Sequence, residues 1–270
     1  MRAGSEDTRG STEGASDSDS SRARLQTGLA WLRSHVEIST LLLFALLTGS
    51  MWGFGELADE VLEGETRAFD RALLMAMRAP GNLEDPWGPP WFEEMARDYS
   101  GLGGVPVLLL LSLGATLFLV LQGHRRTAVF LVAVLLPGLL AISLLKDIFD
   151  RPRPDLVPHL SQVYSSSFPS GHSMGSTFIY LTLAGLLARH ELHWRTRIFL
   201  IGAAVVVAVL VGMSRVYLGV HYPTDVVGGW AAGTAWALVC LLVARGLSFV
   251  GLVEPEASLI PPSPDGKPRD

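Results

Sequence analysis

The chain has 270 residues, of which 49% are hydrophobic and 17% are charged, and its formal net charge is -5 at pH 7. Soluble domains usually carry about 25% charged residues, so this composition favours a membrane protein with several spans. No basic stripe indicates a nucleic-acid partner. The one cysteine, Cys240, excludes an internal disulfide and a thiolate zinc site.

Six long apolar runs predict an all-α, polytopic membrane protein. A helix needs roughly 20 residues to cross the hydrocarbon core of a bilayer, with a range of about 17–25. The alternative, buried helices of a soluble protein, is disfavoured because six such runs exceed an ordinary core. In chain order the predicted spans are about 38–55, 102–122, 127–145, 172–188, 198–214 and 226–244.

The two ends of the chain differ from the membrane domain predicted for residues 24–250. Residues 1–23 are rich in Ser, Gly, Asp and Glu and contain almost nothing apolar, so we expect a disordered tail. Residues 251–270 are rich in proline and are expected to be flexible. The sequence therefore predicts one membrane domain between two flexible tails.

Residues 56–101, between the first two predicted spans, mix charged and apolar residues. Asp70 and Arg71 alternate with Phe69 and Leu73 at a spacing that suits an amphipathic helix at a membrane surface. Several Pro and Trp residues follow, which favours a structured cap at the interface. A solvated connecting loop is the alternative reading of this segment.

The arginines predict the orientation in the membrane. If six spans alternate, nine arginines outside the polar stretches fall on one side, which the positive-inside rule assigns to the cytoplasm. Both termini are then cytoplasmic, and the 56–101 cap faces away from the cytoplasm, as expected in a plasma or inner membrane. These arginines are Arg22, Arg24, Arg33, Arg125, Arg126, Arg189, Arg195, Arg197 and Arg245.

Three cations stand at span ends on the predicted extracytoplasmic side. Lys146 ends the third span, and Arg153 follows in a turn that Pro152 and Pro154 stiffen. Arg215 ends the fifth span. Arginine gives planar, bidentate contacts to a phosphate and lysine gives a point charge, so the three could neutralise a phosphate dianion. The alternative is snorkelling of each side chain to the interface.

The start of the fourth span has the features of an anion site. Ser170 is a favoured helix N-cap residue, and Gly171 allows a ligand close to the backbone. The free N–H groups of a helix N-terminus attract an anion. His172 follows directly and is a candidate acid for a departing oxygen.

His221 and Asp225 form the third polar group. They are four residues apart, with Pro223 favouring a helix start between them. The carboxylate can accept a hydrogen bond from one ring nitrogen, which fixes the tautomer and leaves the other nitrogen free to attack phosphorus. The alternative for His172 and His221 is an ordinary interfacial role.

The three polar stretches resemble the signature of the type 2 phosphatidic acid phosphatase superfamily, which includes lipid phosphate phosphatases and vanadium haloperoxidases. That signature consists of Lys-x6-Arg-Pro, Pro-Ser-Gly-His and Ser-Arg-x5-His-x3-Asp, in this order. The motifs cover about 146–225, and the predicted spans extend the likeness to about 38–244. Here they read Lys146…Arg153-Pro154, Pro169-Ser170-Gly171-His172 and Ser214-Arg215…His221…Asp225.

The resemblance implies a helical bundle with the site near the outer interface, and a role for each motif residue. His221 would be the nucleophile that forms a phosphohistidine, and Asp225 would orient it. His172 would act as general acid and then as the base that activates water. No metal or other cofactor is required, because cations take the place of a metal. The implied phosphate-binding residues are Lys146, Arg153, Ser170, Gly171 and Arg215.

The leading hypothesis is therefore an integral membrane phosphatase acting on a lipid phosphate or pyrophosphate from the bilayer. Undecaprenyl pyrophosphate, phosphatidylglycerol phosphate and phosphatidic acid are candidate substrates, and the sequence does not choose among them. Phosphotransfer to an acceptor other than water remains an alternative, since it uses the same intermediate. A haloperoxidase would need vanadate, and those relatives are typically soluble. A non-catalytic lipid-binding protein or a transporter is the alternative from another class. The oligomeric state stays open.

Overall fold

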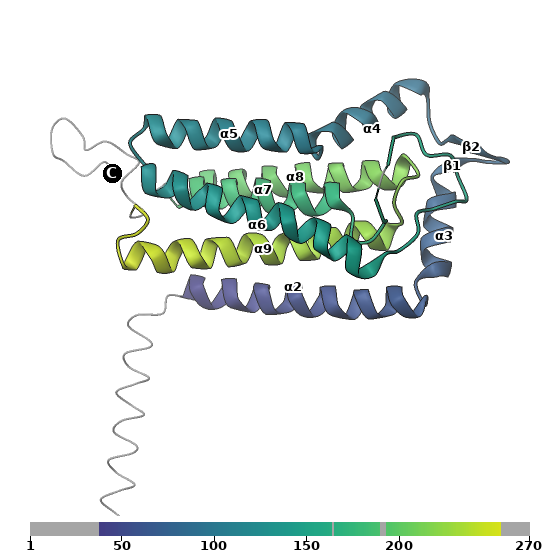
Figure 1. Cartoon of the computed structure of the whole chain (residues 1–270). Coiled ribbons are helices and arrows are strands. Elements are labelled where there is room, and N and C mark those ends of the chain that lie inside the picture. Colours follow the sequence, from purple (N-terminus) through teal and green to yellow (C-terminus); the bar gives the residue numbers. More distant parts are fainter. Residues whose placement is uncertain (1–37, 164, 190–192, 255–270) are drawn as a thin grey trace, which may run out of the picture. The chain divides into compact units, whose positions relative to one another are not determined.

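The computed structural model describes residues 38–163, 165–189 and 193–254 (Figure 1). The chain divides into two compact units, residues 1–45 and 46–270. The predicted disordered tail 1–23 and all but the first four residues of the predicted tail 251–270 lie outside the described residues. The helix bundle and the polar cluster at its end belong to the second unit.

Helices dominate the described chain, in agreement with the predicted fold class. A short antiparallel pair of strands, β1 and β2, interrupts them within the predicted cap. The helices are α2 (Ile38–Glu63), α3 (Arg67–Ala76), α4 (Pro90–Leu102), α5 (Val105–Leu121), α6 (Arg125–Phe149), α7 (Gly171–Ala188), α8 (Trp194–Tyr217) and α9 (Pro223–Phe249), and the strands are β1 (Arg78–Ala79) and β2 (Asn82–Pro86).

Several of these helices have the length and composition of membrane spans. Among the described residues, α2, α6, α8 and α9 are long and apolar enough to cross a membrane. Helices α4 and α5 form a pair bent by 48°, which would make a fifth span if it crosses as one unit. Helix α7 coincides with the fourth predicted span but is not among the helices that are apolar enough to cross a membrane. An integral membrane protein is thus supported, while the count of six spans stays a prediction.

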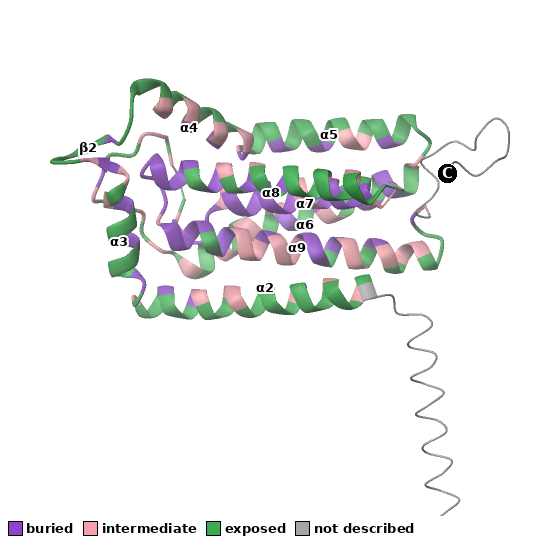
Figure 2. Ribbon diagram, turned by 180° about the vertical axis from the view of Figure 1, so that it is seen from behind, coloured by how far each residue is buried: buried purple, intermediate pink, exposed green. Residues whose placement is uncertain are grey.

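Exposed apolar side chains mark the surfaces that would face lipid. Leu110, Leu113 and Leu121 of α5 are 71%, 66% and 77% exposed, and Figure 2 shows α5 as a mostly exposed helix. Contiguous apolar surface of this extent is rare on soluble monomers. A bilayer supplies the apolar environment that these leucines require.

Helix α7 forms the centre of the bundle and is mostly buried (Figure 2). It packs against both α8 and α9. Gly229 and Gly233 of α9 allow the closest approach, since a Cβ atom at Gly229 would lie 2.7 Å from the Ser170 carbonyl oxygen. Small residues spaced four apart let two helix backbones approach in this way in membrane proteins.

We expect Gly233→Ala to destabilise the bundle by about 1–3 kcal/mol, the usual cost of overpacking. The added Cβ would lie 2.6 Å from the Met174 carbonyl oxygen, and a helix backbone cannot move aside cheaply. Gly246→Ala on the same helix is the matched control, since no atom of the described residues lies within 4 Å of its added Cβ. Thermal unfolding midpoints in one detergent compare the two. Equal midpoints for both variants would contradict the tight α7–α9 contact.

The alternating direction of the last four helices brings the polar stretches together. Helices α6 and α8 end at the same end of the bundle where α7 and α9 begin (Figure 1). Residues 150–170 connect the first pair, and residues 218–222 connect the second. At the opposite end, Glu254 caps α6, where its carboxylate accepts hydrogen bonds from the Arg126 and Thr127 N–H groups at 3.1 and 2.8 Å. Residues 251–254 are thus packed against the bundle.

Candidate active site

The three sequence motifs meet at one end of the bundle, as predicted. The Ser170 N–H group donates to the Asp225 carbonyl oxygen at 2.9 Å, which joins the second motif to the third. Arg153 Nη1 lies 3.3 Å from His221 Nε2, which joins the first motif to the third. The eight residues proposed from the sequence lie at the ends of α6 to α9 or in the loops that join them at this end.

Three cations of this cluster are held by neutral oxygens. Lys146 Nζ donates to the Ser166 carbonyl oxygen at 2.5 Å, and Arg153 Nη1 donates to the Val220 carbonyl oxygen at 2.7 Å. Arg215 Nη1 donates to the Ser100 hydroxyl at 2.6 Å. Among the described residues, no carboxylate forms an ion pair with any of the three. Buried charge of one sign favours an anion as its partner.

His221 and Asp225 form a buried pair beside these cations. His221 Nδ1 lies 3.4 Å from Asp225 Oδ2, and both side chains are almost fully buried. A guanidinium carries only donors, so the contact between Arg153 Nη1 and His221 Nε2 requires a lone pair on Nε2. The proton then lies on Nδ1, which faces Asp225 Oδ2 and also lies 3.3 Å from the Ser167 hydroxyl oxygen. The Nε2 lone pair faces Arg153, one of the three cations.

The electrostatic surroundings keep His221 neutral. Burial lowers the pKa of the imidazole to about 3, and the positive charges of Arg153 and Arg215 act in the same direction. The hydrogen bond and negative charge of Asp225 oppose this shift but do not outweigh it. The Nε2 lone pair of His221 is therefore available at physiological pH.

The N-terminus of α7 contributes a helix start, as the sequence predicted. Ser170 is its N-cap, and its hydroxyl accepts from the Ser173 N–H group at 3.4 Å. It also accepts from the Ser173 hydroxyl at 2.9 Å, so its own O–H donor stays available to an anion beside the N–H groups of the helix terminus. A Cβ at Gly171 would lie 3.2 Å from Lys146 Cε, so glycine lets the lysine lie against the helix start.

His172 occupies the first turn of α7 at the same end. It is close enough to Arg215, His221 and Lys146 for their charges to act on its imidazole. Its backbone packs against the bend between α4 and α5, where a Cβ at Gly103 would lie 3.1 Å from the His172 carbonyl oxygen. This packing fixes the start of α7 beside the cations.

Four residues that the sequence analysis left without a role join the cluster. Ser167 donates to Asp225 Oδ2 at 2.5 Å, and Arg151 donates to Asp225 Oδ1 at 2.5 Å. Asp70 pairs with Arg151, and Ser100 accepts from Arg215. Arg151 lies within the first motif, so its position in the sequence could have indicated a role at the site. Asp70 and Ser100 come from the predicted cap, and the sequence holds no signal for their burial.

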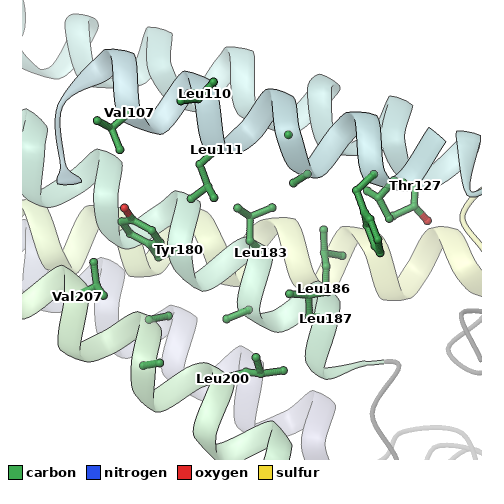
Figure 3. Close-up of a pocket in the computed structure, with 17 residues that line it drawn as sticks. Val107, Leu110, Leu111, Thr127, Tyr180, Leu183, Leu186, Leu187, Leu200 and Val207 are labelled. Carbon is green, nitrogen blue, oxygen red and sulfur yellow. The ribbon is translucent and has the colours of Figure 1, made fainter. Parts of the chain in front are cut away.

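An apolar cavity of about 930 Å³ lies between α5, α7 and α8 (Figure 3). Tyr180 and Leu183 of α7 face Leu110 and Leu111 of α5 across it (Figure 3). None of the eight site residues proposed from the sequence lines it. Leu110 is largely exposed, so the cavity borders the surface that would face lipid.

Comparison with known proteins identifies related sequences. The family model described as the PAP2 superfamily matches residues 126–248. Phosphatidylglycerophosphatase B of Bacillus subtilis is 40% identical over 152 residues, which cover 53% of this chain and 71% of that protein. A lipid A 1-phosphatase of Rhizobium etli is 35% identical over 133 residues, covering 45% of this chain and 53% of that protein. The undecaprenyl-diphosphatase BcrC of Bacillus subtilis is 32% identical over 98 residues, covering 34% and 44%.

A solved structure shows the same architecture. The crystal structure of a transmembrane PAP2 type phosphatidylglycerolphosphate phosphatase from Bacillus subtilis aligns with a TM-score of 0.66 and 29% sequence identity. The alignment covers 76% of this chain and 96% of that chain. The match to the family model contains all three motifs, whereas Asp70 and Ser100 precede it.

Proposed function

The chain belongs to the PAP2 superfamily, and we propose that it hydrolyses the phosphate or pyrophosphate group of a membrane lipid through a phosphohistidine intermediate. One observation carries this proposal. His221 Nε2 lies 3.3 Å from Arg153 Nη1, with the buried Lys146 and Arg215 in the same cluster. A neutral nucleophile beside uncompensated cations suits attack on a phosphate dianion.

In the first step, Arg153, Arg215 and Lys146 hold the phosphate oxygens, and the α7 N-terminus adds backbone N–H groups. The lone pair of His221 Nε2 attacks phosphorus as the bond to the lipid oxygen breaks. The bound phosphate dianion favours the protonated form of His172, which gives its proton to that departing oxygen. Asp225 stays ionised and stabilises the positive charge that develops on the His221 ring, whose Nδ1 proton remains in place.

In the second step, the neutral His172 accepts a proton from a water molecule, and the water oxygen attacks phosphorus. The bond between phosphorus and His221 Nε2 breaks, so inorganic phosphate leaves and the imidazole regains its lone pair. His172 is then protonated again for the next lipid. The cation cluster supplies the charge stabilisation that a metal ion gives in other phosphatases, so the proposed reaction is independent of metal.

The relatives, the position of the site and the arginines support a lipid substrate and an extracytoplasmic site as parts of the proposal. Relatives that are named for phosphatidylglycerophosphate, undecaprenyl diphosphate and lipid A support a lipid substrate. A lipid in the bilayer can present its head group at a helix end while its chains stay among the apolar helices. The arginines near the opposite end, among them Arg125, Arg126 and Arg245, support a cytoplasmic assignment for that end and an extracytoplasmic site.

Phosphate release by the detergent-purified protein tests this function. The panel contains phosphatidylglycerol phosphate, undecaprenyl pyrophosphate, phosphatidic acid and a water-soluble phosphate monoester, each with and without EDTA. We expect release from at least one lipid, a slower reaction with the soluble ester and no effect of EDTA. Activity that disappears in EDTA and returns with a divalent cation would contradict the metal-free mechanism. No release from any lipid would contradict the hydrolase.

A further inference from the structure

Asp70 is a fully buried carboxylate outside the three motifs. It lies in α3, within the segment that the sequence predicted to be a surface cap. Its carboxylate accepts hydrogen bonds from Arg151 Nη2 at 2.7 Å, the Thr224 N–H group at 3.0 Å and the Thr224 hydroxyl at 2.7 Å. A buried charge is retained only when it is paired and hydrogen-bonded. Asp70 is therefore bound to both the first and the third motif.

Arg151 connects this carboxylate to the candidate active site. Its Nη2 donates to Asp70 and its Nη1 donates to Asp225 Oδ1 at 2.5 Å, so one guanidinium bridges two buried carboxylates. The guanidinium also stacks on the Tyr222 ring, with 4.6 Å to the ring centroid. Burial alone would lower the pKa of Arg151, but the charges and hydrogen bonds of Asp225 and Asp70 outweigh it and raise that pKa. The bridge stays charged.

The two carboxylate oxygens of Asp225 therefore have different partners. Oδ1 accepts from Arg151, while Oδ2 accepts from the Ser167 hydroxyl and the Tyr222 N–H group and faces His221 Nδ1. If the carboxylate rotated, its oxygens would no longer meet these partners. The planar fork of arginine fixes the orientation of a carboxylate better than a point charge does.

We propose that Asp70 is a positioning residue for phosphoryl transfer, acting through Arg151 to hold Asp225 in the orientation that sets the His221 tautomer. The proposal rests on the proposed function. It makes the α3 segment part of the catalytic apparatus rather than only a cover over it. A purely structural role, anchoring α3 to the start of α9 through Thr224, is the competing explanation, because it uses two of the same hydrogen bonds.

Steady-state kinetics of Asp70→Asn separate the two explanations. The amide keeps the size of the side chain but removes the charge that pairs with Arg151. We expect kcat to fall by about 10-fold to 100-fold with little change in KM, as for other groups that orient a reacting residue. Asp70→Glu, which keeps the carboxylate, should recover part of kcat. Glu65→Gln, an exposed carboxylate in the turn before α3, is the matched control and should match the wild type.

A double-mutant cycle with Arg151→Gln tests the route of the effect. If Asp70 acts through Arg151, the double variant should be no slower than Arg151→Gln alone. Additive losses would overturn the proposal, as would an Asp70→Asn variant with wild-type kcat and only a lower unfolding midpoint. If Asp70→Asn does not fold, Arg151→Lys provides the same test. One ammonium cannot reproduce the fork, so wild-type kcat in that variant would overturn the proposal.

A second readout does not depend on activity. In ¹⁵N-histidine NMR of the detergent-purified protein, His221 should appear as the tautomer protonated on Nδ1, and His221→Gln assigns its signals. Asp70→Asn should shift these signals or mix the tautomers, whereas Glu65→Gln should leave them unchanged. Unchanged His221 signals in Asp70→Asn would overturn the proposal. A wild type with the expected tautomer but no phosphate release from any lipid would overturn the proposed function and not the positioning contact.

Discussion

His221→Gln should reduce kcat/KM for lipid phosphate release by at least about 10³-fold, since loss of a nucleophile removes the whole covalent route. The glutamine amide has a similar length and can still donate toward Asp225, so the fold should persist. His172 is not placed to replace His221, because packing against Gly103 holds it at the start of another helix. The residual rate would come from the cation cluster alone.

Labelling with a ³²P-lipid provides the direct measurement. The wild type should form a protein-bound phosphate that is stable in alkali and labile in acid, as expected for a phosphohistidine, and His221→Gln should form none. His193→Gln is the matched control, because His193 is exposed and precedes α8 at the opposite end of the bundle. Undiminished labelling or near-normal turnover in His221→Gln would rule out this nucleophile.

The polar cluster of the candidate active site was predictable because its members stand in short motifs at or near helix ends. Local sequence placed Ser170 at the N-cap of α7, and the structure begins that helix at the next residue. The spacing of four residues between His221 and Asp225 was also enough to predict that the two side chains lie close together, since both residues flank the start of α9. Each of these features depends on residues that are close in the sequence. Composition and spacing are therefore enough to predict where the helices start.

The helix ends outside the apolar runs were harder to predict. The first predicted span ended at about residue 55, whereas α2 continues to Glu63, because its last turns alternate charged residues with Leu57, Ala58 and Val61. Hydropathy marks where an apolar stretch ends but not where a helix ends. Helix α4 was missed within the predicted cap, because Pro89 and Pro90 indicate a break while Pro90 in fact starts the helix.

The buried ionic contacts could not be read from the sequence. Asp70 belongs to an amphipathic pattern in which a charged residue normally faces water, and its partner Arg151 is 81 residues away. Ser100 meets Arg215 across 115 residues. Only the packing of α3 and α4 against the ends of α8 and α9 creates these pairs. The predicted cap thus contacts the site through two buried polar side chains, a property that depends on tertiary structure.

Arg215→Lys should lower kcat/KM by about 10²–10³-fold, or about 2.7–4 kcal/mol of transition-state stabilisation. Arg215 is 2% exposed, and its Nη1 is held by Ser100 while its Nε has no hydrogen-bond partner among the described residues. A phosphate oxygen would satisfy that donor. Lysine keeps the charge but loses the planar set of donors, so the variant tests geometry rather than charge.

Inhibition by vanadate shows whether Arg215→Lys weakens binding of the transition state, because five-coordinate vanadate resembles the phosphorus centre during transfer. The inhibition constant of Arg215→Lys should rise in parallel with the fall in kcat/KM, while KM changes less. Arg97→Lys is the matched control, since Arg97 is exposed on α4 and pairs with Glu93 and Glu94. If both variants lose activity equally, the buried guanidinium has no special role. If only Arg215→Lys does, its donors act on the transferring phosphoryl group.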